Sequence, residues 1–396
     1  MPHLQPLYAF GSNGSGQLGI GHNEDVSMPM RCIFEDDPIP SSELSEAEFQ
    51  KPVAAQVSKI AAGGNHTLLL LDDGRVYAAG ERSDGRCGEV KVQNDNGTSG
   101  NRFRRISIQD AQSKTVFQRF KDVSATWEAT MLVAALGDRE DGDTESKMDK
   151  VFVLGSGAKG ELGLGPGVQN AVAKTPVEIP DFPPQDTEVI AIASGMGHTV
   201  AVLSNGGVYG WGASRKGQLG DGLVGEKIVW RPTRIDGIGF PVTLATCGRE
   251  FTALSGNNEK GEFVVLGSIG DRWGVLSNSP RGEDVKAYLS INASWHGVYV
   301  HQKDLSLLAW GRDDRGQLPP TEVKGVKEVA VGSEHVVTLL EDGRVAAWGW
   351  GEHGNCGPET DRQGNVRDVA ACIPVPEGVE VNGVGAGCAT SWIVGS

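Results

Sequence analysis

Two glycine clusters in this 396-residue chain have the spacing G-x-G-x-x-G, which can bind the pyrophosphate of a dinucleotide. They run from Gly14 to Gly19 and from Gly155 to Gly160. Pyrophosphate binding requires that a helix follows the glycines, because the helix N-terminus holds the phosphates. Here each cluster follows an apolar run and leads into another loop and a proline-containing linker. The sequence therefore predicts tight turns at these glycines and no cofactor.

Histidine recurs at one position of a repeated glycine-rich turn, as His66, His198 and His335. Imidazole can bind a metal, but a metal site needs ligands that converge from different segments, and the spacing indicates none. Recurrence at equivalent positions favours a structural role, in which a ring nitrogen ties one turn to a backbone group elsewhere. The sequence contains no Ser-His-Asp set, H-E-x-x-H or G-x-x-x-x-G-K motif. We therefore predict no catalytic residues, no bound metal and a protein that is not an enzyme.

The residue pair at this turn differs between copies of the repeat. Regular copies carry Asn65-His66, Gly197-His198 and Glu334-His335, whereas irregular copies carry Trp127-Glu128, Arg249-Glu250 and Trp295-His296. Trp and Arg are the residues that most often anchor a protein interface. The pattern predicts that this end of a central channel binds a partner. The alternative is that the two tryptophans only fill a wide channel.

A second group of aromatic residues lies in the loops that end each repeat. Trp273 stands where other copies have the Leu of Gly-Gln-Leu-Gly, so it either fills the same pocket or contacts a partner. Trp350 stands where other copies have a small residue, and we expect it to be exposed. The predicted partner-binding residues are Trp127, Glu128, Arg249, Glu250, Trp295, His296, Glu334, His335, Trp273 and Trp350.

The elements that position these residues come from a unit that occurs seven times, in which an apolar run ends in Gly and leads into Gly-Gln-Leu-Gly or a degenerate form of it. First halves of the unit, such as residues 57–80, 189–212 and 326–349, contain short apolar runs separated by turn residues. Such runs predict strands, and no long run has a period of 3.6 residues. Because a four-stranded unit cannot cover both its faces, the copies must stack. We predict an all-β, seven-bladed β-propeller of four-stranded blades.

The two ends of the chain complement each other. The N-terminus begins with a second half of the repeat, from Tyr8 to Gly21, and the C-terminus from Val379 is an unpaired first half. Together they complete one blade, so pairing of the terminal segments would close the ring and remove an open sheet edge. The prediction is one propeller domain over residues 1–396.

The composition argues against a nucleic-acid-binding, secreted or membrane-spanning protein. There are 36 basic and 51 acidic residues, and the net charge of −15 repels a phosphate backbone and favours basic partners at long range. Six scattered cysteines, and an N-terminus without the pattern of a signal peptide, predict a cytosolic or nuclear protein. No apolar run approaches the length of about 18 residues that spans a membrane.

Three segments exceed the repeat and are predicted loop insertions, at residues 35–52, 92–114 and 137–150. Their polar composition indicates solvated loops. The second segment also contains a basic cluster, Arg102, Arg104 and Arg105, which is the best candidate for an inserted loop that binds a partner.

Gly-Gly-x-His-Thr, Asp-Gly-x-Val-Tyr, Trp-Gly and Gly-Gln-Leu-Gly recur in this order over nearly the whole chain. In this respect the sequence resembles the regulator of chromosome condensation repeat family, whose members form seven-bladed propellers. With no attached module, it looks most like the small members similar to the fungal alpha-tubulin suppressor, or killer-toxin-insensitivity, proteins. That resemblance implies an adaptor that binds a small acidic zinc-ribbon electron carrier. This partner serves Elongator-dependent modification of tRNA wobble uridines and diphthamide synthesis.

The resemblance also implies an alternative, nucleotide exchange on a Ran-type small GTPase through acidic and His residues at the same end of the channel. In this chain Glu128, Glu250, Glu334 and His296 are the residues that could take that role. The sequence lacks the basic N-terminal tail that attaches such factors to chromatin. We therefore expect a monomer when the protein is alone and a heterodimer when it binds either partner.

Overall fold

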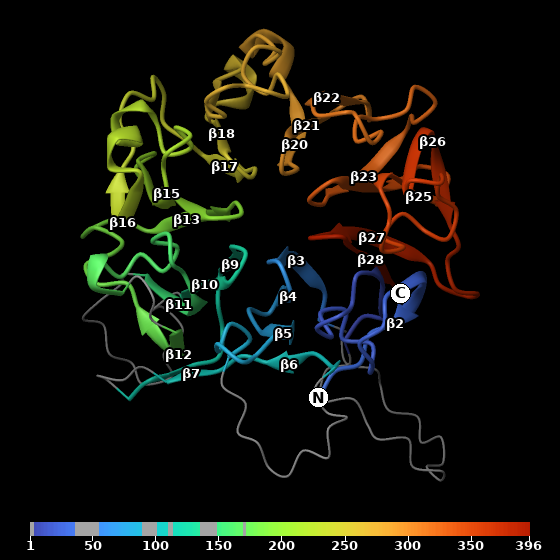
Figure 1. The fold of residues 1–396 in the computed structure, drawn as a ribbon, viewed down its shortest axis with the longest axis horizontal. Coiled ribbons are helices and arrows are strands. Elements are labelled where there is room, and N and C mark those ends of the chain that lie inside the picture. The colour runs from blue at the N-terminus through green and yellow to red at the C-terminus, as the bar shows by residue number, and fades with distance from the viewer. Residues whose placement is uncertain (1–3, 36–54, 89–100, 110–113, 135–148, 169–171) are drawn as a thin grey trace.

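A computed structural model of the protein describes residues 4–35, 55–88, 101–109, 114–134, 149–168 and 172–396. Seven antiparallel sheets stand around a central channel, so the molecule is a ring (Figure 1). In each sheet the strand that opens the repeat lines the channel, and the later strands lie progressively outward. The predicted all-β, seven-bladed propeller is confirmed.

We number the blades along the chain, with blade 1 containing both termini. Blade 1 consists of β27 (Val381–Ala386), β28 (Thr390–Gly395), β1 (Leu7–Gly11) and β2 (Val26–Arg31). Blade 2 consists of β3 (Val57–Ala62), β4 (His66–Leu71), β5 (Val76–Gly80) and β6 (Arg104–Arg105). Blade 3 consists of β9 (Asp122–Ala125), β10 (Ala129–Ala134), β11 (Lys150–Ser156) and β12 (Val172–Glu178). Blade 4 consists of β13 (Val189–Ser194), β14 (His198–Leu203), β15 (Val208–Ala213) and β16 (Ile228–Arg234).

The remaining three blades are less uniform. Blade 5 consists of β17 (Leu244–Cys247), β18 (Phe251–Ser255) and β19 (Phe263–Gly267). Blade 6 consists of β20 (Tyr288–Ala293), β21 (Gly297–Gln302) and β22 (Leu307–Gly311). Blade 7 consists of β23 (Val326–Val331), β24 (His335–Leu340), β25 (Val345–Trp350) and β26 (Asn365–Ile373).

Blades 5 and 6 thus have three strands, where the sequence analysis predicted four in every blade. Proline does not account for this difference, because the fourth strands β2, β12 and β16 contain Pro29, Pro176 and Pro232. An outer strand tolerates proline, since one of its edges has no neighbouring strand to receive an N–H. The other five blades have the predicted four strands, and β7 (Ile108–Gln109) with β8 (Val116–Phe117) forms a small separate sheet.

The ring is closed by the two ends of the chain. β1 pairs antiparallel with β28, with Tyr8 opposite Ile393 and Ala9 opposite Trp392. The sheet order is β2-β1-β28-β27, so the two N-terminal strands and the two C-terminal strands form one continuous sheet. This pairing confirms closure by the N- and C-terminal segments and covers the edges that each segment would otherwise expose.

Packing between blades explains the burial pattern of the strands. All six residues of the second strands β4, β14 and β24 are buried, because these strands lie between neighbouring blades. The recurring Trp of the third strand donates its indole N–H to a loop carbonyl of the preceding blade: Trp211 to Glu161 at 2.9 Å and Trp348 to Gln317 at 3.1 Å. Blades 4 and 7 are thereby attached to the loop of the blade before them.

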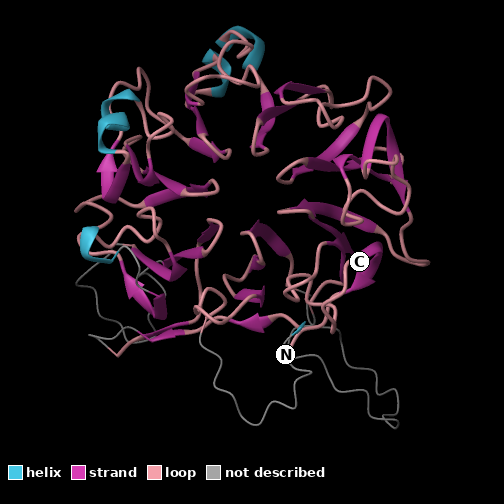
Figure 2. Ribbon diagram, viewed as in Figure 1, coloured by secondary structure: helices cyan, strands magenta, loops and turns pink. Residues whose placement is uncertain are grey.

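Helical structure in the described residues comprises short 3₁₀ turns, which lie at the outer rim of the ring (Figure 2). They are η3 (Pro166–Val168), η4 (Asp221–Glu226), η5 (Asn258–Lys260) and η6 (Gly282–Val285). Over the part of the chain that the structure describes, no helix is long and apolar enough to cross a membrane.

The predicted insertions are only partly described. Residues 36–52, 92–100, 110–113 and 137–148 of those segments lie outside the described residues. The basic cluster is not wholly an inserted loop, because Arg104 and Arg105 form β6, the outer strand of blade 2. Phe103 beside them is buried and stacks on Phe34 with ring centroids 5.3 Å apart. At the end of the third segment, Lys150 begins β11.

Candidate functional site

Two sets of loops meet on one side of the ring. In an antiparallel blade, the turn between the first and second strands lies at the same end as the loop after the third strand. We call this side the turn face. Its turns comprise residues 63–65, 126–128, 195–197, 248–250, 294–296, 332–334 and 387–389, and its loops comprise residues 12–18, 81–87, 157–163, 214–220, 268–275, 312–318 and 351–357.

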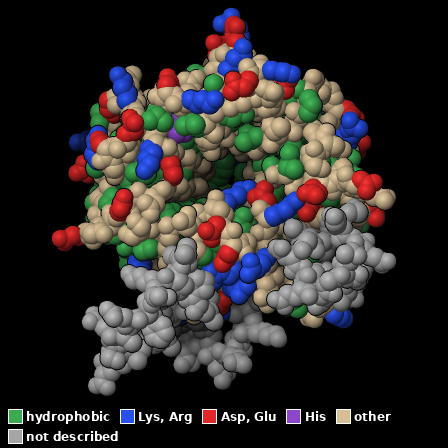
Figure 3. All heavy atoms as spheres, turned by 180° about the vertical axis from the view of Figure 1, so that it is seen from behind, with side chains coloured by type: hydrophobic (Ala, Val, Ile, Leu, Met, Phe, Trp, Pro, Cys, Tyr) green, Lys and Arg blue, Asp and Glu red, His purple; other side chains and the backbone are tan. Residues whose placement is uncertain are grey.

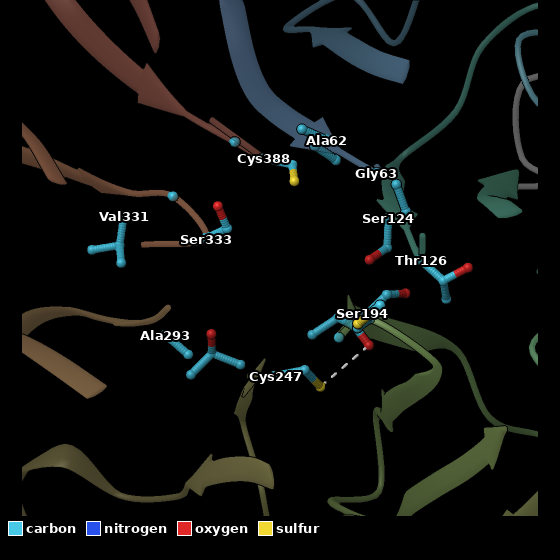
Figure 4. Close-up of a pocket in the computed structure, with 18 of the residues that line it drawn as sticks. Ala62, Gly63, Ser124, Thr126, Ser194, Cys247, Ala293, Val331, Ser333 and Cys388 are labelled. Carbon is cyan, nitrogen blue, oxygen red and sulfur yellow. Dashed lines mark hydrogen bonds between the residues drawn. The ribbon is translucent and has the colours of Figure 1, made fainter. Parts of the chain in front are cut away.

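The channel behind the turn face contains a cavity of about 320 Å³, lined by the first strands of the blades that surround it. Small polar side chains and two thiols point into it, among them Ser194, Ser333, Cys247 and Cys388 (Figure 4). The space-filling view shows the centre of the ring as a hollow with charged side chains of both signs around its opening (Figure 3). The turns of the turn face form the mouth of this channel.

Trp127 and Trp295 meet at that mouth. They come from blades 3 and 6, and their ring centroids are 5.8 Å apart with planes tilted by 48°. Backbone bonds fix both turns, because Trp127 N–H donates to Met196 at 3.0 Å and Trp295 N–H donates to Ser333 at 2.9 Å. Both indoles line the channel and are half-buried. The two indoles therefore fill part of the channel mouth and keep part of their surface exposed.

Glu334 is the centre of a second group. It is only 4% exposed, and its Oε1 accepts hydrogen bonds from His296 Nδ1 at 2.9 Å and from Arg312 Nη1 at 3.0 Å. Its Oε2 accepts one from Gln317 Nε2 at 2.6 Å. Burial by itself raises the pKa of this carboxyl, but the bonds from His296 and Gln317 and the charge of Arg312 outweigh it and lower the pKa. Glu334 is therefore a buried carboxylate that joins blades 6 and 7.

This group follows a rule of the ring: a loop residue of one blade faces the turn residue of the next. Gln317 faces Glu334, and Trp273 of blade 5 faces His296 of blade 6 with ring centroids 6.1 Å apart. Arg86 of blade 2 lies 3.9 Å from the Glu128 carboxylate of blade 3. The irregular turn residues His296 and Glu128 therefore face irregular residues of the preceding loop, whereas Gln317 and Glu334 both belong to regular copies.

Arginines stack on three of the tryptophans. The guanidinium carbons of Arg272 and Arg312 both lie 4.6 Å from the centroid of Trp273. Arg249 lies 5.7 Å from the Trp295 ring, and Arg315 lies 5.2 Å from the Trp350 ring. Such contacts are attractive because the face of an indole carries negative potential.

The ten predicted partner-binding residues divide by exposure. Glu128 and Arg249 are exposed, whereas Trp127, Glu250, Trp295, His296, Trp273 and Trp350 are half-buried on the turn face. Trp350 was expected to be exposed, but its ring packs edge-on against His353 with centroids 5.3 Å apart and donates from Nε1 to Glu352. Glu334 and His335 are buried, which leaves them without a surface that a partner could contact.

The recurring histidines have the predicted structural role. Nε2 of His66, His198 and His335 lies 2.9–3.0 Å from a hydroxyl of the next blade, on Thr130, Thr252 and Ser391, respectively. The prediction named a backbone group as partner, whereas the hydroxyl accepts from the ring and itself donates to a loop carbonyl, as Thr130 does to Arg86. Burial lowers the pKa of these histidines to about 3, about 4 and about 4, so they are neutral.

The sequence analysis missed Arg272, Arg312 and Arg315. Each lies in a loop after a third strand: Arg272 directly precedes Trp273, Arg312 follows the glycine that ends β22, and Arg315 precedes the Gly of Gly-Gln-Leu. The available signal was the occurrence of Arg beside tryptophan-containing loops in an acidic chain.

Known proteins share this architecture. A model of the regulator of chromosome condensation (RCC1) repeat matches residues 6–70, 149–202 and 205–255, and a second model of the same repeat matches residues 57–89, 189–218 and 326–355. The chain belongs to the RCC1 repeat family. RCC1 repeat-containing protein C10F6.04 of Schizosaccharomyces pombe is 31% identical over 394 residues, which cover 98% of each chain.

Two further similar proteins are a named exchange factor and a solved propeller structure. The secretion-regulating guanine nucleotide exchange factor of Mus musculus is 25% identical over 96% of this chain and 82% of its own. The crystal structure of Prp20p from Saccharomyces cerevisiae, described with its binding properties to Gsp1p and histones, has a TM-score of 0.70 at 20% identity. It covers 100% of this chain and 92% of that chain, and it shows the shared fold.

These findings correct one prediction. From the sequence we expected a protein that is not an enzyme. That prediction is wrong, because RCC1-repeat relatives that span nearly the whole chain include a named guanine nucleotide exchange factor, and such factors catalyse nucleotide release. Lack of a catalytic triad or cofactor motif does not argue against this activity, since an exchange factor acts by binding its partner.

Proposed function

We propose that this RCC1-repeat propeller acts as an adaptor that binds a partner protein on its turn face. The observation that carries the proposal is the pair Trp127 and Trp295, whose half-buried rings are fixed by backbone hydrogen bonds at the channel mouth. Rigid, partly exposed indoles next to Arg249 have the composition of an interface centre, where Trp and Arg contribute most.

The partner that we propose is a small acidic zinc-ribbon electron carrier. Through it the protein would serve Elongator-dependent modification of tRNA wobble uridines and diphthamide synthesis, in the cytoplasm and the nucleus. The family resemblance suggests this partner, and the arginines stacked on the turn face support an acidic one. The net charge of −15 opposes an acidic partner at long range, but at contact the local cations dominate, because salt screens charges beyond about 8 Å.

The test is binding of the purified zinc-ribbon protein to this chain by calorimetry. We expect the double variant Trp127→Ala/Trp295→Ala to weaken binding by at least about 30-fold, since each central tryptophan contributes about 2 kcal/mol or more. A matched control is Ile190→Ala/Leu289→Ala, which removes two exposed apolar side chains outside the turn face. Unchanged binding by a folded double variant would contradict the proposal.

A second candidate function is guanine nucleotide exchange on a Ran-type GTPase, and it is favoured by the exchange factor among the relatives. Of the residues named for this role, Glu128 is exposed and Glu250 is half-buried, so both could contact a GTPase. Glu334 is held by His296, Arg312 and Gln317, and could act only if this group opened. The test is release of a fluorescent nucleotide from the GTPase: catalytic amounts of the protein should accelerate it, and Glu128→Gln should slow it.

A further inference from the structure

We propose that Arg249, Arg272 and Arg315 form a receptor for a carboxylate-rich segment of the partner protein. We call these three residues the arginine row. The inference rests on the proposed function, because it names the chemistry by which the turn face recognises its partner. It concerns residues other than the tryptophan pair at the channel mouth.

The first step is that each guanidinium of the row is held in place before any partner binds. Arg249 lies over Trp295, Arg272 over Trp273 and Arg315 over Trp350. The rings in turn are supported, since Trp273 also stacks on Arg312 and Trp295 packs on Trp127. A stacked arginine loses less rotamer freedom on binding than one that extends freely into solvent.

The second step is that the row lacks carboxylate partners. Within the described residues, none of the three forms an ion pair or a side-chain hydrogen bond, whereas their neighbour Arg312 is paired with both Asp314 and Glu334. Guanidinium groups bind carboxylates through two parallel hydrogen bonds. The turn face therefore presents three guanidinium groups that have aromatic support and form no ion pair among the described residues.

The third step is that nearby acidic side chains are already occupied. Asp271 accepts hydrogen bonds from the backbone of Leu276 and Ser277, and these bonds outweigh burial and lower its pKa. Asp313 accepts from the backbone of Leu318 at 3.0 Å, and Glu352 accepts from Trp350. Asp314, whose pKa is lowered chiefly by Arg312 and to a lesser extent by Arg315, is paired with Arg312, and Glu250 lies 3.9 Å from Lys216. These carboxylates thus have other partners, and the row can pair with an external one.

The fourth step is the arrangement of the row. Its arginines belong to two consecutive blades, since Arg249 and Arg272 lie in blade 5 and Arg315 lies in blade 6, and Arg315 reaches the Trp350 ring of blade 7. These blades run from β17 to β26 along one side of the ring in Figure 1. An extended segment with several Asp or Glu residues matches such a spread of separate cations. A nucleic acid is the less favoured polyanion, because a net charge of −15 repels its continuous phosphate charge.

The test uses the full chain and three labelled probes: an oligoglutamate peptide of ten residues, the matching oligoglutamine peptide and a ten-nucleotide RNA. We expect binding of the oligoglutamate only, measured by fluorescence anisotropy. The triple variant Arg249→Gln/Arg272→Gln/Arg315→Gln should weaken it by at least about tenfold, since hydrogen bonds to charged groups are the stronger class. Preference for the RNA, or equal binding of both peptides, would overturn the inference.

The matched control is Arg234→Gln/Arg281→Gln/Arg344→Gln, which removes three exposed arginines outside the turn face. Both triple variants change the net charge equally, so a general charge effect would weaken binding in both. Equal weakening would overturn the inference. A second experiment uses the zinc-ribbon protein as probe. If the triple row variant binds it as well as the wild type does, the inference is overturned and the proposed function stands. If the wild-type chain binds oligoglutamate at the row but does not bind the zinc-ribbon protein, the proposed partner alone is overturned.

Discussion

Gln317 of blade 6 donates a hydrogen bond from Nε2 to Oε2 of Glu334 in blade 7 at 2.6 Å. The two residues occupy positions that recur around the ring, one in the loop after a third strand and one in the turn after a first strand. The same pair of positions is filled by Arg86 with Glu128, and in blade 5 Trp273, at the next position of the loop, packs against His296. Variation at the turn is therefore coupled to variation in the preceding blade, and each pair acts as a joint between blades.

The Glu334 joint should contribute to stability. Glu334→Ala removes the acceptor of His296, Arg312 and Gln317 in a buried site, and we expect a loss of about 2–4 kcal/mol in the free energy of unfolding. Urea titration at pH 7.5 measures the loss. Glu334→Gln keeps one acceptor oxygen and should lose less, and the exposed control Glu352→Ala should change the free energy by under about 0.5 kcal/mol. A Glu334→Ala variant as stable as the wild type would contradict the role of this joint.

The recurring histidines predict an acid-sensitive fold. Burial lowers the pKa of His66, His198 and His335 to about 3, about 4 and about 4, whereas in the unfolded chain the pKa is about 6.5. Between these values the unfolded state binds more protons, so stability falls as pH decreases below about 6.5. From pH 7.5 to pH 5 we expect a loss on the order of 2 kcal/mol for each histidine.

The measurement is the free energy of unfolding in urea across that pH range. His198→Gln removes one titrating group and preserves an N–H that can donate to Thr252. Its stability should therefore depend less on pH than that of the wild type. Parallel pH curves for the two proteins would show that His198 titrates alike in the folded and unfolded chain, against the prediction.

Glycine at the end of the third strand should be essential. Gly212 has φ +99°, and a Cβ at this position would lie 2.5 Å from the carbonyl oxygen of Gly197. Because the obstacle is backbone, Gly212→Ala should cost several kcal/mol, on the order of 3 or more. The control is Gly222→Ala in η4, where nothing lies within 4 Å of the added Cβ. Thermal unfolding of both variants checks the contrast, which is lost if both melt alike.

Much of the fold could be predicted because it depends on local patterns. The strands follow from short apolar runs, and closure follows from the complementary half-repeats at the two ends. The role of His66, His198 and His335 followed from their equivalent positions. Blades 5 and 6 have three strands in the structure, and the repeat pattern gave no signal of this difference, since proline also occurs in the fourth strands β2, β12 and β16.

The site was harder to predict, because its contacts join residues from different blades. Glu334 was taken as a surface residue, since nothing in its own repeat indicates that His296 and Arg312, 38 and 22 residues away, would bury it. The Arg272 and Arg312 stack on Trp273 depends in the same way on how blades 5 and 6 are placed. The sequence predicted that Trp127 and Trp295 lie at the channel mouth. It did not predict their contact, because they belong to blades 3 and 6 and the width of the channel cannot be read from the repeat.

Closure by β1 should be necessary for a stable ring. Phe10 is fully buried, and β1 supplies the hydrogen-bonding partner of β28 from Leu7 to Gly11. A chain that starts at residue 36 would expose the edge of β28, and exposed edges promote association with other chains. We expect this truncated chain to aggregate during size-exclusion chromatography.

Addition of a peptide with residues 4–35 should restore a monomeric complex, because the missing strands can pair in trans. The same peptide with Phe10→Asp should fail, since it would bury a charge without a partner. A truncated chain that remains monomeric and folded without peptide would contradict the requirement for closure.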